Sequence, residues 1–220
     1  MTFEMVDHRQ RHFLPAAGHD LFLPLYDPLV SLMGGDRARK ELVAQAKLRP
    51  NHRVLDVGCG TGTLMMLLKR RYSTLQVSGL DPDAKALRRA SNKATRAGVS
   101  MQLDQGFGDA LPYGNATFDR VFSSFMFHHL EEENREKTLH EVSRVLIPGG
   151  SFHLLDFAGS EQGSHGLPGH FLRSHARLKD NNHIRILQLM RRAGFRGGEK
   201  VKDGSMLFGL LQITYYQATM

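Results

Sequence analysis

A glycine-rich turn between two apolar segments is the feature that most constrains how this chain can fold. Residues 54–57 form a short, mostly apolar run, and Gly58, Gly60 and Gly62 lead from it into a second apolar run at 63–68. Glycine lets a ligand approach the backbone without meeting a Cβ atom. A helix that begins after such a turn offers free N–H groups to an anionic group. The pattern therefore predicts a nucleotide-type cofactor site at the carboxyl end of a parallel strand.

The glycine spacing separates this turn from that of the dinucleotide dehydrogenases, which favour G-x-G-x-x-G. Here the pattern is G-x-G-x-G, with Asp56 two residues before the first glycine. A carboxylate at that point suits a cationic ligand group better than a pyrophosphate. The alternative is a glycine turn that holds no ligand.

Residues 52–62, HRVLDVGCGTG, resemble the first motif of the class I S-adenosylmethionine-dependent methyltransferases, which is close to V-L-D-x-G-C-G-T-G. The resemblance implies S-adenosyl-L-methionine as the cofactor. It also implies a set of cofactor-binding residues within the motif: Asp56, Gly58, Cys59, Gly60, Thr61 and Gly62.

An acidic residue follows the turn at the distance expected for ribose recognition. Asp81 comes 21 residues after Gly60, at the end of the second predicted strand, where a carboxylate can accept hydrogen bonds from both ribose hydroxyls. The resemblance assigns Asp81 this role, and Pro82 restricts the backbone beside it. The alternative for Asp81 is a helix N-cap, for which Asp83 is better placed.

The adenine-binding loop departs from the family pattern. The family usually carries Gly-Asp-Ala-x-x-Leu-Pro-Phe, with the Asp bonding the adenine amino group, whereas residues 106–112 read GFGDALP. Alignment on the Leu-Pro pair puts Phe107 at the acidic position. Either Phe107 packs on the adenine, with Gly106 beside it, or the loop shifts and Asp109 replaces the missing acid. We favour the first arrangement because the Leu-Pro anchor is close by.

The segment after the fourth predicted strand favours a small-molecule methyltransferase. Ser124 ends this strand, where the family places cofactor and substrate, and FMFHHL follows at 125–130 in place of the Asn-Pro-Pro-Tyr typical of base N-methylation. This segment at 125–130 resembles the corresponding segment in the methyltransferase branch that includes the quinone and sterol C-methyltransferases. His128 or His129 could act as a general base toward a hydroxyl acceptor, since imidazole changes charge near neutral pH. Alternatively, one histidine bonds the backbone and the other faces solvent.

Several large apolar side chains are expected to line the substrate pocket: Tyr26, Met33, Phe125, Phe127 and Phe171. The alternative is that they are ordinary core residues. Residues 158–182 are rich in glycine and histidine and form a candidate lid, because long insertions of this kind often carry function. The histidines after the fifth strand are spaced by five, five and eight residues. This spacing does not fit a helical metal site, so no metal is expected.

Strands alternate with helices through most of the chain, which predicts a doubly wound α/β fold. The predicted strands are 54–57, 75–80, 99–104, 118–124 and 151–157, and the predicted helices between them are 63–71, 84–96 and 134–146. A tail follows with a helix at 186–193, a short strand at 201, a turn at 204–205 and a strand at 207–218. The resemblance implies a Rossmann-like, mostly parallel sheet of seven strands with one antiparallel edge strand.

The length of 220 residues fits a single methyltransferase domain. We divide it into an N-terminal helical cap or lid at 1–48, a cofactor-binding core at 49–157, the candidate lid at 158–182, and a C-terminal helix with an antiparallel strand pair at 183–220. Within the cap, two helices are expected between residues 26 and 48, separated by a break at 34–35.

Composition narrows the environment and the partners. The formal charge of +7 allows a nucleic-acid partner, but the basic residues are spread over several predicted helices. One cysteine excludes an intrachain disulfide. The chain has no apolar run near the ~20 residues of a membrane span, and the N-terminus lacks the apolar core of a signal peptide. A cytoplasmic protein with a small-molecule substrate is therefore expected.

The sequence thus predicts an S-adenosylmethionine-dependent methyltransferase that acts on an O, N or C nucleophile of a small, apolar or aromatic molecule. An RNA or protein methyltransferase is the alternative suggested by the charge. A non-catalytic cofactor-binding partner subunit is the alternative suggested by the missing adenine acid. The sequence does not identify the substrate, the acceptor atom or the oligomeric state.

Overall fold

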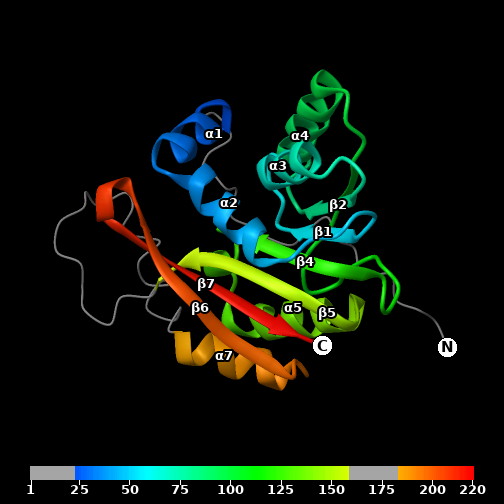
Figure 1. The fold of residues 1–220 in the computed structure, drawn as a ribbon, viewed down its shortest axis with the longest axis vertical. Helices are drawn as coiled ribbons and strands as arrows, with labels where there is room; N and C mark the ends of the chain where they lie inside the picture. The colour runs from blue at the N-terminus through cyan, green and yellow to red at the C-terminus, as the bar shows by residue number, and fades with distance from the viewer. Residues whose placement is uncertain (1–22, 159–182) are drawn as a thin grey trace.

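The computed structural model describes residues 23–158 and 183–220, with side chains from residue 28 onward. These residues form a seven-stranded sheet with helices on both faces (Figure 1). The strands are β1 Arg53–Val57, β2 Gln76–Asp81, β3 Gln102–Gln105, β4 Phe118–Ser124, β5 Leu146–Phe157, β6 Gly197–Met206 and β7 Leu211–Thr219. The helices are α1 Leu23–Leu32, α2 Gly35–Gln45, α3 Thr63–Arg71, α4 Ala84–Ala97, α5 Glu132–Val145 and α7 His183–Arg192, with short 3₁₀ turns η3 Phe127–His129 and η4 Leu207–Gly209.

The strand order is β3-β2-β1-β4-β5-β7-β6, and the first five strands in this order are parallel. This arrangement confirms the predicted doubly wound α/β fold. β7 runs antiparallel to both β5 and β6, so the reversed strand lies one place inside the edge. β2 and β3 lie on one side of β1 in the sheet, and the chain then crosses to β4 on the other side of β1. The carboxyl ends of β1, β2 and β4 therefore surround the topological switch point, where open α/β sheets bind ligands.

The last hairpin turns later than the sequence predicted. The turn expected at Gly204-Ser205 is wrong, because β6 continues through both residues to Met206 and the chain reverses at η4. Gly204 pairs with Ile213, whose side chain would lie 3.2 Å from a Cβ atom at Gly204. Glycine here relieves crowding within a strand. The hairpin tip is tied to the cap, since the Leu207 N–H donates to the Met33 carbonyl at 2.9 Å.

The helix break within the cap agrees with the sequence, but several strands begin at other residues than predicted. Gly34, with φ of 97°, separates α1 from α2 and confirms the predicted break. β5 and β6 start earlier than the predicted residues 151 and 201. Within the described ranges, 23–158 and 183–220, no helix is long and apolar enough to cross a membrane.

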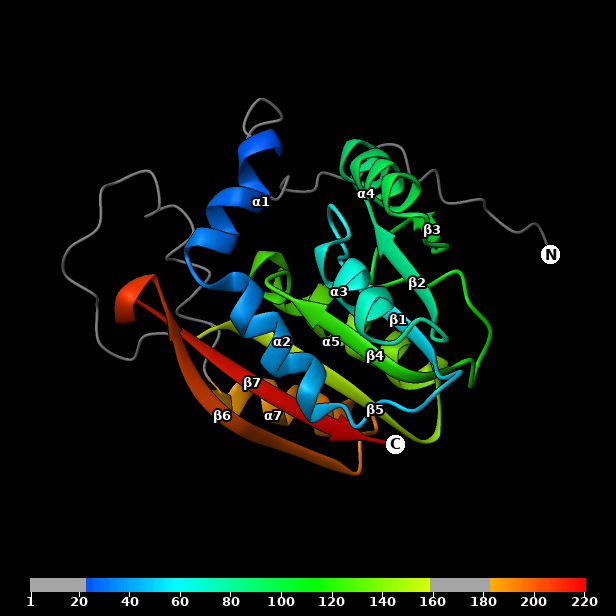
Figure 2. The ribbon, with the colours of Figure 1, turned by 45° about the horizontal axis from the view of Figure 1, so that its top comes forward.

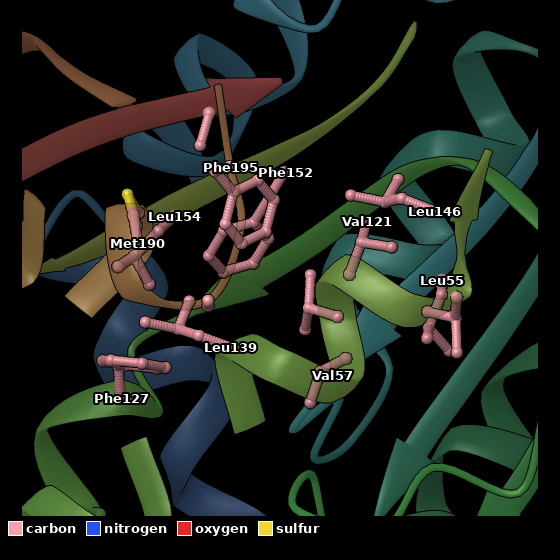
Figure 3. Close-up of a cluster of buried hydrophobic side chains, with 14 of the residues drawn as sticks. Leu55, Val57, Val121, Phe127, Leu139, Leu146, Phe152, Leu154, Met190 and Phe195 are labelled. Carbon is pink, nitrogen blue, oxygen red and sulfur yellow. The ribbon is translucent and has the colours of Figure 1, made fainter. Parts of the chain in front are cut away.

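The sheet separates two clusters of buried apolar side chains. One cluster packs β-strand residues against α5 and α7 and is shown in Figure 3, while the other packs them against α2 and α3. Figures 1 and 2 show α5 and α7 on one face of the sheet and α2, α3 and α4 on the other. Val54 and Leu55 of β1 alternate between the two clusters, as successive residues of a strand buried on both faces must.

Truncating a buried leucine should destabilise the protein far more than truncating an exposed one. Leu139 on α5 is fully buried, whereas Leu32 is 84% exposed. Leu139→Ala should lower the free energy of unfolding by about 3 kcal/mol, through lost apolar burial and the cavity left behind. Leu32→Ala should change it by no more than about 0.5 kcal/mol. Urea unfolding measures both, and equal losses would contradict the described core.

Candidate functional site

The glycine turn holds the carboxyl ends of β1 and β2 together. The N–H groups of Gly58 and Cys59 both donate to the Leu80 carbonyl, at 2.8 and 3.0 Å. Gly58 and Gly62 adopt φ of 73° and 75°, a region that favours glycine. A Cβ atom would lie 2.3 Å from Met126 Cγ at Gly58 and 2.9 Å from Ala90 Cβ at Gly62. Both glycines are therefore required by the packing of the protein itself.

Gly60 is different, because its surroundings are open. Its φ is 52°, yet no heavy atom of the described chain beyond its immediate neighbours lies within 4 Å of where a Cβ would be. Its N–H donates to Asp81 Oδ2 at 2.8 Å. The turn therefore leaves space above its own backbone, at the carboxyl edge of β1 and β2.

Asp81 is held at this edge by backbone donors. Its carboxylate accepts hydrogen bonds from the N–H groups of Gly60 and Asp83, at 2.8 and 2.9 Å. Burial raises the pKa of Asp81 to about 6, and these two hydrogen bonds partly oppose that rise. The N-cap of α4 is Asp83, whose side chain accepts from the Lys85 N–H. The capping role is thus filled by Asp83, and Asp81 belongs to the glycine turn.

Asp56 is a fully buried carboxyl group at the end of β1, and its Oδ1 has no hydrogen-bond partner in the described structure. Burial raises the pKa of Asp56 to about 7; the positive charge of Arg39 opposes the shift and Asp81 reinforces it. A buried acceptor without a partner costs free energy. The site is therefore suited to a ligand that brings a positively charged donor to Asp56.

The loop at 106–112 is anchored at both ends. The Gly106 N–H donates to the Asp81 carbonyl at 3.2 Å, and the Leu111 N–H donates to Glu141 Oε2 on α5 at 2.8 Å. Between them, a Cβ at Gly108 would lie 3.0 Å from the Thr138 side chain. Phe107 and Asp109 flank this tight position and are each partly buried. Which of the two meets adenine stays a prediction.

A backbone distortion follows β4. Phe125, directly after Ser124, has φ of 57°, which costs a non-glycine residue about 1–2 kcal/mol. Its buried ring lies 5.2 Å from the Phe157 ring, and the Arg39 guanidinium lies over it at 5.2 Å. Such strain gathers at ligand sites in other proteins. Here it turns the chain sharply at the same edge of the sheet as the glycine turn.

The two candidate histidines differ in their surroundings. His128 is buried, and its ring Nδ1 lies 2.6 Å from Asp156 Oδ1. Its backbone N–H donates to Asp156 Oδ2 at 2.7 Å. His129 is partly exposed, with its ring 4.0 Å from that of His128. The sequence analysis missed Asp156. The available signal was a carboxylate near the end of a strongly apolar strand, where burial requires a partner.

The predicted pocket residues fall into three groups. Met33 and Phe125 belong to the apolar cluster beside α2 and α3. Phe127 is fully buried in the other cluster, beside α5 and α7 (Figure 3). The Tyr26 side chain, Phe171 and nearly all of the candidate lid at 158–182 lie outside the described residues. Among the pocket residues whose side chains are described, Met33 and Phe125 therefore share one face of the sheet and Phe127 lies on the other.

Comparisons with known proteins agree with this geometry. Residues 54–150 match a family model described as a methyltransferase domain. The chain is 35% identical over 147 residues to a demethylmenaquinone methyltransferase from Thermus thermophilus, covering 66% of each chain. It is 36% identical over 146 residues to a protein of the same name from Deinococcus radiodurans, covering 65% of this chain and 60% of the relative.

A solved S-adenosylmethionine-dependent methyltransferase from Aquifex aeolicus shares the fold, with a TM-score of 0.65 and 20% identity over 87% of this chain and 92% of that one. The chain belongs to the class I S-adenosylmethionine-dependent methyltransferases. The matched residues cover 66% of the length of the Thermus relative and 60% of the length of the Deinococcus relative.

The open space at Gly60 leads to a prediction with a matched control. Gly98, the C-cap of α4, has φ of 63° and is also open, but lies away from the switch point. Gly60→Ala and Gly98→Ala should each cost about 1–2 kcal/mol of stability, because both place a Cβ in the left-handed region. Only Gly60→Ala should weaken S-adenosylhomocysteine binding, by about tenfold or more, through overlap with the ligand. Calorimetry showing equal affinity for both variants would contradict a ligand over Gly60.

Asp56 should make cofactor affinity depend on pH. Its pKa of about 7 in the free protein means that the carboxyl is largely protonated at pH 6 and ionised at pH 8. A cationic ligand favours the ionised form, so binding must release a proton below pH 7. The dissociation constant for S-adenosylmethionine should therefore rise about tenfold from pH 8 to pH 6. The Asp56→Asn variant should bind S-adenosylmethionine more weakly, and its dissociation constant should change little between pH 6 and pH 8. An equally steep pH profile in the variant would assign the titration to another group.

Proposed function

We propose that the protein transfers the methyl group of S-adenosyl-L-methionine to a small apolar or aromatic molecule. The observation that carries the proposal is the buried carboxyl group of Asp56, whose Oδ1 has no hydrogen-bond partner in the described structure, near the open backbone of Gly60. This pairing fits a ligand that is cationic and lies against the turn. The matches to two demethylmenaquinone methyltransferases support a small acceptor of similar character.

The cofactor would be held along the carboxyl edge of β1, β2 and β4. We assign it to the glycine turn, with Cys59 and Thr61 completing the motif, to Asp81 and Pro82 at the ribose, and to Ser124 at the end of β4. For the adenine we favour Phe107 and Gly106, since the close packing at Gly108 opposes a two-residue shift of the loop. When bound, the cofactor supplies a methyl group on a positively charged sulfur.

The chain's own contribution is to hold the acceptor in line and to exclude water. Met33 is only partly buried against the apolar cluster that contains Phe125, and this apolar surface suits an uncharged acceptor. A cytoplasmic location belongs to the same proposal and is supported by the single cysteine.

His128 is the better candidate for a general base. An ionised carboxylate only accepts hydrogen bonds, so Asp156 fixes the proton of His128 on Nδ1. The second ring nitrogen, Nε2, is then an acceptor that can take a proton from a hydroxyl group as the methyl is transferred. Asp156 would act as a positioning residue through His128.

Labelled methyl transfer tests the reaction class. Purified protein with radiolabelled S-adenosylmethionine should label a solvent-extractable small molecule in a cell extract. The label should survive nuclease and protease treatment. Label that follows RNA or protein would favour the alternative acceptors, and binding without any transfer would favour a non-catalytic partner subunit.

His128→Gln should separate catalysis from binding. Loss of a general base should lower kcat about 100-fold, while the dissociation constant for S-adenosylhomocysteine should stay within about twofold because His128 is not assigned to the cofactor. His129→Gln is the matched neighbour and should keep most of the activity. Thermal unfolding checks that both variants are folded. Equal, small effects on kcat would mean that the reaction needs no base from this pair.

A further inference from the structure

One side of α5 follows the loop that leads from β3 to β4. A Cβ atom at Gly108 would lie 3.0 Å from the Thr138 side chain. One turn further along the helix, Glu141 Oε2 accepts a hydrogen bond from the Leu111 N–H at 2.8 Å. Residues three apart on a helix are neighbours on its surface. The helix therefore contacts the loop at successive points.

Arg144 continues this contact on the next turn of α5. Its Nη1 donates to the Tyr113 carbonyl at 2.8 Å and to Asn115 Oδ1 at 2.9 Å. Its Nη2 donates to the Leu111 carbonyl at 3.0 Å. A guanidinium group has five N–H donors and can serve several acceptors at once. Arg144 thus binds the loop backbone on both sides of Pro112.

Glu141 and Arg144 also bind each other through two parallel hydrogen bonds. Nε and Nη2 of Arg144 donate to Oε1 and Oε2 of Glu141, both at 2.7 Å. This bidentate geometry fixes both side chains. The hydrogen bond from Arg144 lowers the pKa of Glu141, so the carboxylate is ionised at neutral pH. We call the pair of Glu141 and Arg144 the α5 clamp.

Further hydrogen bonds fix the loop away from the α5 clamp. The Tyr113 hydroxyl donates to Asp104 Oδ2, near the end of β3, at 2.8 Å. Within the loop, the Ala110 N–H donates to the Phe107 carbonyl at 3.2 Å. Together with the α5 clamp, these bonds hold the backbone of residues 107–113 in a defined shape.

We propose that Glu141 and Arg144 are positioning residues that make the loop selective for a base with an exocyclic amino group. This inference rests on the proposed function, which assigns adenine to Phe107 and Gly106. The side chain of Phe107 has no acceptor for an amino group. A backbone carbonyl of the loop is a strong acceptor and can take that role if it is held in place. The α5 clamp holds it through the loop, from behind the base.

S-inosylhomocysteine tests this selectivity, because it carries an oxygen in place of the adenine amino group of S-adenosylhomocysteine. By calorimetry, the unmodified protein should bind S-adenosylhomocysteine at least about tenfold more tightly than S-inosylhomocysteine. Glu141→Ala and Arg144→Met should each reduce this preference to less than about threefold, because the loop carbonyl is no longer fixed. Equal weakening of both ligands, with the preference unchanged, would show a general structural effect and overturn the assignment.

Glu133→Gln is the matched control on the same helix. Glu133 pairs with Lys137, and both side chains are exposed, so the variant should keep the full preference. Glu141→Gln keeps an oxygen acceptor for the Leu111 N–H and should retain part of the preference. Asp109→Asn leaves the α5 clamp intact and should keep the preference. Its loss in Asp109→Asn would assign the selectivity to that carboxylate and overturn the inference.

Amide hydrogen exchange on the unmodified protein keeps the proposal falsifiable if the α5 variants fail to fold. The Leu111 N–H should exchange slowly before any ligand is added, because Glu141 already accepts its hydrogen bond. Fast exchange at Leu111, or equal affinity of the unmodified protein for the two compounds, would overturn the inference while leaving the proposed function intact. Binding of neither compound would instead contradict the proposed function itself.

Discussion

The site depends on the hydrogen bonds that tie the glycine turn to the end of β2. Gly58 and Cys59 share the Leu80 carbonyl as acceptor, and the Gly60 N–H donates to Asp81. These bonds satisfy the turn's own backbone, so the left-handed glycines can remain at the strand ends without unpaired buried groups. They also fix Asp81 and Gly60 relative to each other. The cofactor edge is therefore built into the sheet before any ligand arrives.

In the free protein, the buried charged groups at this edge are not fully paired. Asp56 and Asp81 both have raised pKa values because burial removes them from water. Arg39 offsets part of this at Asp56 without pairing with it. An arrangement of this kind costs stability in the free state. It is expected where function needs unsatisfied groups that a charged ligand completes.

The sequence predicted the core better than the periphery. The turn, the parallel strands and the helix caps could be predicted because each depends on local rules, such as glycine at positive φ and Asp83 at an N-cap. The sequence placed the hairpin turn at Gly204, but this glycine is needed because a side chain there would crowd the paired strand β7. Local sequence does not show such a contact. Asp156 and Arg39 were missed for the same reason, since their roles arise from elements far apart in the chain.

The central claim is that a cofactor lies over the open backbone of Gly60, between Asp56 and Asp81. Amide NMR of ¹⁵N-labelled protein during titration with S-adenosylhomocysteine tests it most directly. The account predicts the largest shifts at Gly60, at Asp81 and at Phe107, with Gly98 unchanged as an internal reference. Shifts centred elsewhere on the sheet, or no shifts at ligand concentrations that saturate related enzymes, would contradict it.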